Sequence, residues 1–388
     1  MIKLRKYRSD LIMIAFFSLL CIALAFIPGW RGKHETNDSA ICCRGEIVKV
    51  NNSGVVRQGV VTIGYQKLEL KLLSGKFKGK VVDATNELLG RMDIDKMFAK
   101  GDIALVVVSL NPEGKILYVN AQDHYRLHWE ITLFVLFALL LIAFGGLTGF
   151  KAIISFVFSC LIIWKAVIPL SLDGYDPVLL ALGALAVLTA AIIFLVAGLN
   201  AKGVASFSGA FLGVMTSCAL AVYFTGTLRL HGAVMPFAET LLYSGFAHLN
   251  LAKLYAAAVF FASSGAVMDL AVDVAAGMQE VIREKPDITR RELCMCGIRV
   301  GRAVVGTMTT TLLLAYSGGY LTLIMAFMAQ GVPAANFFNY LFVAAEVLKT
   351  LVGSLGLILV APFTAVVGSF IFKAAQKRNA AKTLAESN

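Results

Sequence analysis

Long blocks of uncharged apolar residues constrain the fold of this chain more than any other feature of its sequence. About 20 apolar residues, each rising about 1.5 Å, span the roughly 30 Å hydrocarbon core of a bilayer. Because the core offers the backbone no water, each such block must satisfy its own hydrogen bonds as a helix. Charged residues make up only 15% of the 388 residues, against about 25% in a soluble domain. The sequence therefore predicts an all-α polytopic membrane bundle.

One apolar block lies near the N-terminus, and the others follow much later. The first runs from Leu11 to Ile27 behind a basic segment, which is typical of an anchor helix or of a cleaved signal peptide. We favour the anchor, because the run stays apolar beyond Ala23-Leu24-Ala25, the motif that resembles a cleavage site. Seven later spans are predicted over residues 130–148, 152–172, 177–198, 203–225, 252–275, 303–326 and 339–371. With about eight spans in total, both termini lie on the same side.

Residues 30–128 have a different character, with short β-branched runs separated by turn signals such as Asn51-Asn52-Ser53-Gly54 and Asn111-Pro112-Glu113-Gly114. Six short strands in about 90 residues suit a small closed β-barrel. We therefore predict four regions, namely a cytoplasmic N-terminus with helix 1 (residues 1–29), an extracytoplasmic β-rich domain (30–128), a seven-helix membrane domain (129–372) and a cytoplasmic tail (373–388).

The orientation follows from basic residues in the short connections, because cytoplasmic segments are enriched in Lys and Arg. On the predicted outer side, the short connections hold only Arg229 and Lys253. On the predicted inner side are Lys3, Arg5, Lys6, Arg8, Lys151, Lys202, Arg283, Lys285, Arg290, Arg291, Arg299, Arg302, Lys373, Lys377, Arg378 and Lys382. Since the net charge of +11 is spread in this way, we expect the bilayer as a partner and no nucleic acid.

Two carboxylates in one span are the first candidates for function. An Asp, Lys or Arg at the centre of a membrane helix costs roughly 2.5–3.5 kcal/mol on insertion scales, so such residues are functional candidates by default. Asp269 and Asp273 are four residues apart and share a helix face. They would repel each other if both were ionised, so the pair could carry a proton or bind a cation. Alternatively, both lie near the head groups and pair with the Arg-rich loop.

Further candidates come from the two spans that follow. In the seventh span Arg302 could hold the carboxylates charged, and Thr307 and Thr311 share a face. These hydroxyls would line a proton or ion path, or simply bond to the previous turn. In the eighth span Glu346 and Lys349 are three residues apart and would either form an internal ion pair or reach toward Asp269.

We expect no enzyme, no cofactor and no metal. The sequence contains no P-loop, no His-Glu-x-x-His and no Gly-x-Ser-x-Gly motif. An intramembrane aspartyl protease would need its two aspartates on separate helices, whereas Asp269 and Asp273 share one. The seven cysteines have no zinc-ligand spacing.

Several motifs in the last three predicted spans resemble the YibE/F family of bacterial multi-pass membrane proteins. They are Gly265-Ala266-Val267-Met268-Asp269, Arg290-Arg291-Glu292-Leu293, Gly301-Arg302, Thr307-Met308-Thr309-Thr310-Thr311-Leu312, Leu314-Ala315-Tyr316-Ser317-Gly318, Ala345-Glu346, Gly353-Ser354-Leu355-Gly356 and Pro362-Phe363-Thr364-Ala365. The resemblance covers nearly the whole chain and implies no particular biochemical activity. The chain departs from the family pattern at Ala303, usually Asp, and at Thr310, usually Asn.

Two functions remain open from the sequence. One is a proton- or ion-coupled transporter or export component in the bacterial cytoplasmic membrane, because permeases of the resistance–nodulation–division type and SecD/SecF share the exported domain after helix 1. The alternative is a non-transporting scaffold whose exported domain recruits a protein or a small-molecule ligand, with the buried charges fixing helix register. The oligomeric state is not predicted.

Overall fold

A computed structural model describes residues 2–27 and 40–387 of the chain. Residues 1, 28–39 and 388 lie outside this description, as do the side chains of residues 2–10, 379–380 and 382–387. The first predicted residues of the exported domain, 30–39, therefore lie outside the described residues. The side chains of the basic cluster from Lys3 to Arg8, which was predicted to orient helix 1, lie outside them as well. The chain divides into two compact units, one comprising residues 30–140 and the other the remainder.

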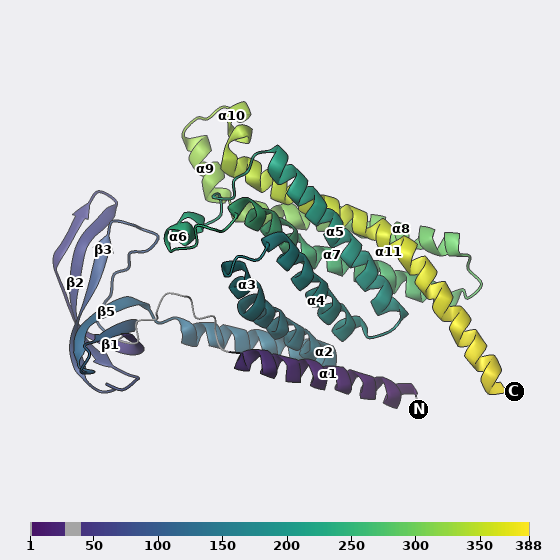
Figure 1. The fold of residues 1–388 in the computed structure, drawn as a ribbon, viewed down its shortest axis with the longest axis horizontal. Coiled ribbons are helices and arrows are strands. Elements are labelled where there is room, and N and C mark those ends of the chain that lie inside the picture. The colour runs from purple at the N-terminus through teal and green to yellow at the C-terminus, as the bar shows by residue number, and fades with distance from the viewer. Residues whose placement is uncertain (1, 28–39, 388) are drawn as a thin grey trace. The chain divides into compact units, whose positions relative to one another are not determined.

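The smaller unit contains a closed five-stranded barrel (Figure 1). Its strands are β1 (Ala40–Gln58), β2 (Val61–Leu72), β3 (Val81–Leu89), β4 (Ile103–Leu110) and β5 (Ile116–His124). They follow the order β1-β2-β3-β5-β4, in which β3 and β5 are parallel. This is the strand order of the five-stranded Greek-key barrels known as OB-folds. The predicted small β-barrel is confirmed, with five strands instead of six.

The difference in strand number arises at Asn51-Asn52-Ser53-Gly54, which is not a turn between strands. This segment is an irregularity inside β1, where the register with β2 shifts between Asn51 and Gly54. Gly54 is needed there because a Cβ would come within 2.9 Å of the Tyr65 ring. The chain turns later, at Gly59, which has φ 62. A polar tetrapeptide that ends in glycine has the same composition whether it forms a turn between strands or an irregularity within one. The sequence therefore places the turn at residues 51–54 and not at Gly59.

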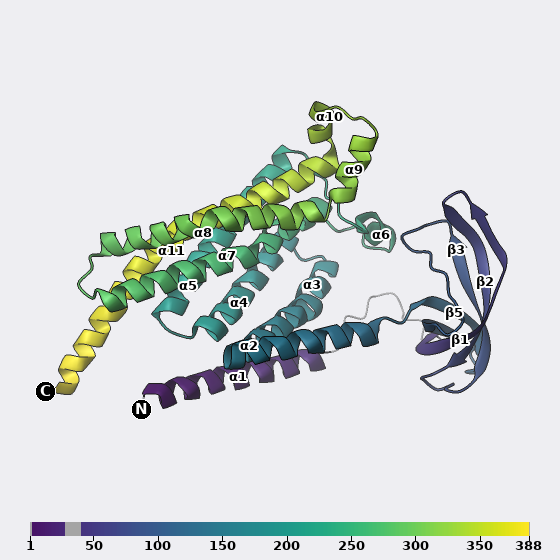
Figure 2. The ribbon, with the colours of Figure 1, turned by 180° about the vertical axis from the view of Figure 1, so that it is seen from behind.

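The larger unit is a helical bundle (Figures 1 and 2). Its elements are α1 (Ile2–Phe26), α2 (Leu127–Ile162, which begins in the smaller unit), the π-helical turn η1 (Ile163–Val167), α3 (Ile168–Leu172), α4 (Pro177–Ala197), α5 (Ala201–Thr227), α6 (Ala238–Tyr243), α7 (Leu251–Glu284), α8 (Arg290–Gly318), α9 (Leu321–Ala329), α10 (Ala334–Asn339) and α11 (Leu341–Ser387). Helices α5, α7, α8 and α11 run side by side.

The predicted count of eight spans is not confirmed. Among the described residues, five helices are long and apolar enough to cross a membrane, or six if α8 and α9, which are bent by 63°, form one broken span. In α1 the apolar part, Leu11–Phe26, is shorter than these. The stretch Leu127–Leu172 counts as a single helix of 46 residues, which would be about 69 Å long if it were straight.

That stretch is not straight, because the chain reverses at Gly146. Gly146 has non-helical angles of φ 53 and ψ −128. A Cβ on Gly149 would overlap the carbonyl of Leu141, which in a straight helix would be about 12 Å away along the axis. The reversal lies close to the boundary between the predicted spans 130–148 and 152–172.

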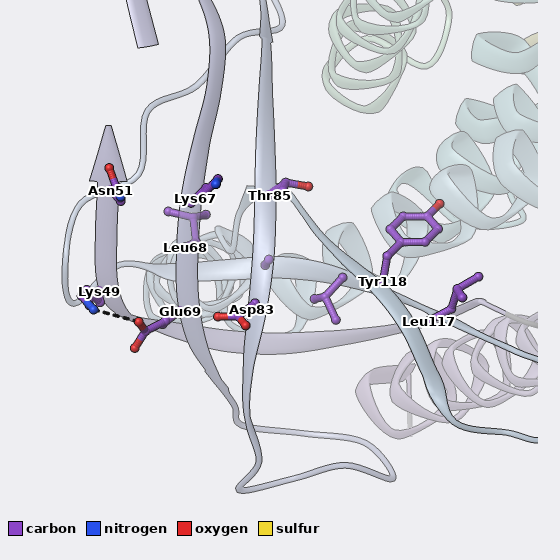
Figure 3. A pocket seen from close by; sticks show the side chains of 11 residues that line it. Lys49, Asn51, Lys67, Leu68, Glu69, Asp83, Thr85, Leu117 and Tyr118 are labelled. Carbon is purple, nitrogen blue, oxygen red and sulfur yellow. Dashed lines mark hydrogen bonds and ion pairs between the residues drawn. The ribbon is translucent and has the colours of Figure 1, made fainter. Parts of the chain in front are cut away.

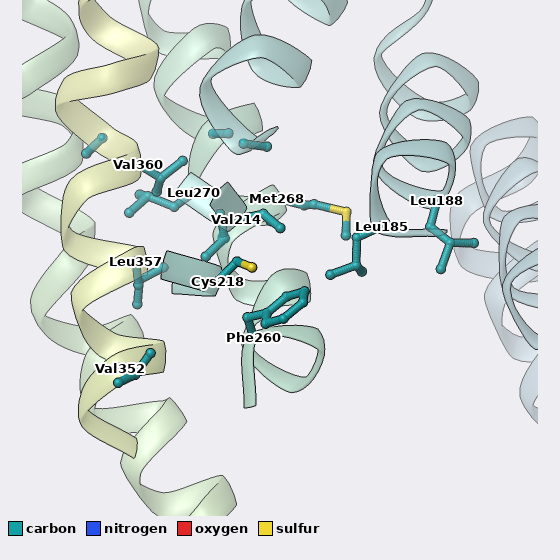
Figure 4. Close-up of a cluster of buried hydrophobic side chains, with 14 of the residues drawn as sticks. Leu185, Leu188, Val214, Cys218, Phe260, Met268, Leu270, Val352, Leu357 and Val360 are labelled. Atoms are coloured by element: carbon teal, nitrogen blue, oxygen red, sulfur yellow. The ribbon is translucent and has the colours of Figure 1, made fainter. Parts of the chain in front are cut away.

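Small residues allow the central helices to approach closely, as they do in other membrane bundles. Gly213 of α5 packs against Val267 of α7 and Val360 of α11, and a Cβ there would come within about 3 Å of both. Figure 4 shows Val214, Phe260, Leu270, Leu357 and Val360 in the apolar core among these helices. These contacts fix which residues of different helices lie at the same depth.

Candidate functional site

One end of the bundle encloses a carboxylate and an ammonium group on α11. Glu346 and Lys349 lie three residues apart, so they share a face, and Lys349 Nζ is 3.9 Å from Glu346 Oε2. Their side chains are only 16% and 26% exposed, respectively. This distance is too long for a hydrogen bond, and Oε2 has no hydrogen-bond partner among the described residues. Glu346 is therefore charge-compensated but not fully satisfied.

Three tyrosines complete this cluster, and none of them was predicted as a site residue, although Tyr316 lies in one of the family-like motifs. The Lys349 ammonium lies 4.8 Å from the centre of the Tyr316 ring and 6.0 Å from that of Tyr320, within the range of cation–π attraction. Tyr320 also interacts with the Glu346 carboxylate. The Tyr255 hydroxyl of α7 donates a 2.5 Å hydrogen bond to the carbonyl of residue 345. Sequence spacing does not predict this grouping, because Tyr316 lies on α8 whereas Tyr320 follows the end of that helix and precedes α9.

Two cavities meet at this cluster. A cavity of about 110 Å³ is lined by Tyr255, Tyr320, Glu346 and Lys349, together with apolar residues. A second, of about 250 Å³, is lined mainly by apolar side chains of α8 to α11 and also reaches Tyr320 and Glu346. The first is large enough for a few water molecules, each of which occupies about 30 Å³ in the liquid. The carboxylate therefore borders space on two sides.

Asp269 and Asp273 lie elsewhere. Both side chains are exposed on α7. The Tyr255 hydrogen bond places the Glu346 cluster beside the first turns of α7, and Asp269 follows Tyr255 by 14 residues, or about 21 Å of helical rise. The predicted composite site, in which Glu346 joins Asp269, is therefore not formed, since two parallel helices keep these side chains at different depths.

Arg302 is likewise exposed, on α8. Gly301 packs against Ala361 of α11, which lies 15 residues beyond Glu346, or about 22 Å. Within the described residues, Arg302 makes no ion pair with Asp269, Asp273 or Glu346. The predicted tuning of the carboxylates by this guanidinium is thus not seen within one chain.

Thr307 and Thr311 are exposed on α8, and their hydroxyls form hydrogen bonds within the same helix. Thr307 donates to the Val304 carbonyl at 2.9 Å, and Thr311 donates to the Thr307 carbonyl at 3.0 Å. Such bonds to the previous turn are common for threonine in helices. The hydroxyl oxygens can still accept a hydrogen bond or ligate a cation, but their protons are already engaged.

The barrel has a pocket of its own, of about 500 Å³, on the outer face of β1, β2, β3 and β5 (Figure 3). Lys49 and Glu69 form a 3.0 Å ion pair at its edge, and Asp83, Thr85 and Tyr118 also line it. The pocket is open, and apolar side chains such as Leu117 line it together with the polar and charged ones. Its charges are of both signs, which does not select one ligand class.

Among the described residues, no group of three or more His, Cys, Asp or Glu side chains is placed to hold a metal ion. Residues 133–374 match a family model described as YibE/F-like protein. No curated protein and no solved structure matches. The matched segment contains the Glu346 cluster as well as the exposed charges of α7 and α8, and it begins after the last strand of the barrel.

Proposed function

Because this chain belongs to the YibE/F-like protein family, as its motifs predicted, and carries an enclosed carboxylate in the matched region, we propose that it couples proton or cation movement to transport or export. The observation that carries the proposal is Glu346, whose Oε2 is buried without a hydrogen bond and which borders two cavities. Ionisable groups enclosed in a membrane bundle are a recurrent feature of ion and proton pathways.

The cluster has the parts that such a step requires. With Glu346 ionised, Lys349 is its counter-charge at 3.9 Å. When Glu346 takes up a proton, or when a cation enters, this attraction is lost. Lys349 then relies on the faces of Tyr316 and Tyr320 alone. Binding thereby changes the contacts between α11 and the bend that follows α8, and a change of that kind can alter which side of the bundle is open.

The proposal includes the cellular location and the orientation of the protein. The protein resides in the bacterial cytoplasmic membrane with both termini in the cytoplasm, which the distribution of Lys and Arg supports. The barrel is then extracytoplasmic and binds an extracytoplasmic protein or a small-molecule ligand. The protein has no catalytic activity of its own. Asp269, Asp273, Arg302, Thr307 and Thr311 are not required to form the coupling site with Glu346.

Ion flux in liposomes tests the proposal. The purified protein is reconstituted with a pH-sensitive dye trapped inside, and a pH gradient is applied with and without Na⁺ or K⁺. We expect flux above that of protein-free liposomes and a loss of about tenfold or more in Glu346→Gln. Glu239→Gln, a matched change of an exposed carboxylate on α6, should keep the wild-type rate. Wild-type flux in Glu346→Gln, or no flux in the wild-type protein, would refute the coupling role.

The scaffold function has support of its own, because the barrel is a compact unit with a separate hydrophobic core. Replacing residues 40–124 by a flexible linker distinguishes the two. If the deletion phenotype of the gene is restored by Glu346→Gln and Asp269→Asn but not by the linker variant, the scaffold function is correct.

A further inference from the structure

Helices α7 and α8 leave one polar face uncovered by the rest of the bundle. On α7 the exposed residues Ala262, Gly265, Asp269 and Asp273 recur at intervals of three or four, so they form one stripe. Asp269 and Asp273 both remain exposed in the described part of the chain. Lipid-facing helix surfaces are ordinarily apolar, so two carboxylates on this stripe need an explanation.

The corresponding face of α8 carries small, polar and basic residues. Its exposed positions include Arg299, Arg302, Ala303, Gly306, Thr307 and Thr310. A Cβ on Gly265 or on Gly306 would meet no atom within 4 Å, so neither glycine is explained by packing inside the chain. Small residues on a membrane helix allow another helix to approach closely.

Asp269 lies deep along the bundle. Gly213, the thirteenth of the 27 residues of α5, packs against Val267, and Asp269 follows Val267 by two residues. It is therefore near the middle of α5 and about 15 Å from the nearer end of that helix. Long side chains such as Arg can extend to the head groups, but the short side chain of Asp cannot cross that distance.

Asp273 and Arg302 lie at the same depth on neighbouring, antiparallel helices. Gly277 packs against Val300, and Gly301 lies beside Val274. Continuing this register places Asp273 level with Arg302 and Ala303, and Asp269 level with Thr307. Yet Asp273 and Arg302 form no ion pair within the described part of one chain. Charges of both signs thus occur at one depth on the exposed sides of α7 and α8, without an ion pair between them in the described part of one chain.

We propose that a second copy of this chain covers the α7–α8 face, giving a symmetric dimer. Two copies with the same orientation in one bilayer are related by a two-fold axis along the helices, so residues of equal depth meet across the interface. Asp273 of each copy then faces Arg302 of the other, with Arg299 about one turn away. Asp269 meets the hydroxyls of Thr307 and Thr310. Gly265, Ala303 and Gly306 permit the close contact.

The charge pattern favours a second copy over a different partner. A foreign helix would have to supply a cation at the depth of Asp273 and an anion at the depth of Arg302. A copy of this chain supplies both, because the two charges are at one depth on the exposed sides of α7 and α8. The dimer also removes the carboxylates from lipid, where they are costly.

Charge reversal tests this pairing. Fluorescently labelled protein is reconstituted at decreasing density in liposomes, and photobleaching steps are counted. We expect two steps for the wild-type protein, and a rise in the dimer dissociation constant of about tenfold or more for Asp273→Arg and for Arg302→Asp, since each places like charges opposite each other. The double variant should return to near the wild-type constant. Glu239→Arg, a charge reversal on α6, should have no effect.

Cysteine crosslinking locates the interface in the same protein with its seven native cysteines replaced. Gly306→Cys should give a covalent dimer in membranes after mild oxidation, whereas Val187→Cys, which is 50% exposed on α4, should not. A wild-type protein that bleaches in one step at all densities would overturn the proposal. Single reversals that dimerise normally, or a double variant that remains monomeric, would overturn it as well.

Discussion

Replacing Gln66 of β2 by methionine should strongly destabilise the barrel, because this buried amide holds the segment between β3 and β4 in place. Gln66 Oε1 accepts from the backbone N–H of Phe98 and from Asn86 Nδ2, both at 2.9 Å. Its Nε2 donates to the Phe98 carbonyl at 3.2 Å and to Asn52 Oδ1 at 2.7 Å. Gln66 and Asn86 are fully buried, so water does not replace these bonds.

The magnitude follows from the groups that lose their partners. Methionine fills a similar volume but neither donates nor accepts strongly, which leaves the buried N–H and C=O of Phe98 unpaired. Each such group costs about 1–3 kcal/mol, so the free energy of unfolding should fall by about 2–6 kcal/mol. Local opening of residues 90–102 would let water bond to the unpaired groups. The fall in the free energy of unfolding should therefore lie in the lower half of that range.

The assay is urea unfolding of a fragment spanning residues 40–126, which holds all five strands and their separate core. With a slope of about 1 kcal/mol per M for a domain of this size, the midpoint should fall by about 2–4 M or the fragment should not fold. Lys71→Met, on the exposed side of the same strand, should change the free energy of unfolding by about 0.5 kcal/mol or less. A Gln66→Met midpoint equal to that of the wild type would refute this account of the barrel.

Three further predictions concern helix contacts and acid sensitivity. Gly209→Ala should lower the thermal midpoint in detergent, because a Cβ would come within 2.7 Å of the Thr364 Cα. Such an overlap destabilises the fold by about 1–3 kcal/mol. The control is Gly183→Ala, where a Cβ meets nothing within 4 Å, and it should not lower the midpoint. Asp176→Ala should cost about 1–2 kcal/mol by thermal unfolding, because Asp176 caps α4 through the Val178 N–H and pairs with Lys253 at 2.5 Å; an unchanged midpoint would contradict this. The barrel should lose stability in acid, because the N–H groups of Leu89 and Arg91 hold the pKa of Asp95 below its usual value. Since the pKa of Asp95 is lower in the folded state than in the unfolded state, this stabilisation is present above about pH 4. It is lost as the pH falls through the folded pKa. Asp95→Asn should therefore flatten the change in the urea midpoint between pH 7 and pH 3, and an unaltered pH dependence would exclude this role.

The two units differ in how far their sequence predicts them. The barrel is predictable because its strands alternate between buried and exposed residues, as β3 does from Val82 to Leu88. This alternation can be recognised in one strand without knowing which strands pair with it. The number of spans is harder to predict, because hydropathy does not report the direction of a helix. The break near Gly146 lies close to a predicted boundary, whereas the 63° bend after α8 changes the topology without a change in composition. Backbone geometry decides where each helix breaks or bends, and a glycine permits such a turn without specifying it.

The candidate site is predictable only in part. Glu346 and Lys349 stand out as charges in an apolar segment, and their spacing of three residues already predicts the pair. Tyr255 and Tyr316 do not stand out, since aromatic residues are common in any apolar core, and their role depends on contacts between helices far apart in the sequence. The grouping of Glu346 with Asp269 failed for the same reason, because sequence spacing gives positions along one helix and not the alignment of two.

The distance between the two charged places limits how they can act together. At about 21 Å and an effective dielectric constant of about 20, two unit charges interact by about 0.8 kcal/mol, too little for the charge on Glu346 to set the state of Asp269 directly. Any larger coupling must pass through movement of helices that contribute to both places. Helix α7 meets this condition, since Tyr255 ties its first turns to α11 beside Glu346 and its later turns carry Asp269 and Asp273. Rigid displacement of a packed helix is an established way to link distant sites. If the α7–α8 face is covered by a second copy, a shift of α7 driven at Glu346 in one copy would displace Asp273 against Arg302 of the other, so the two clusters would communicate across the dimer as well as within each chain.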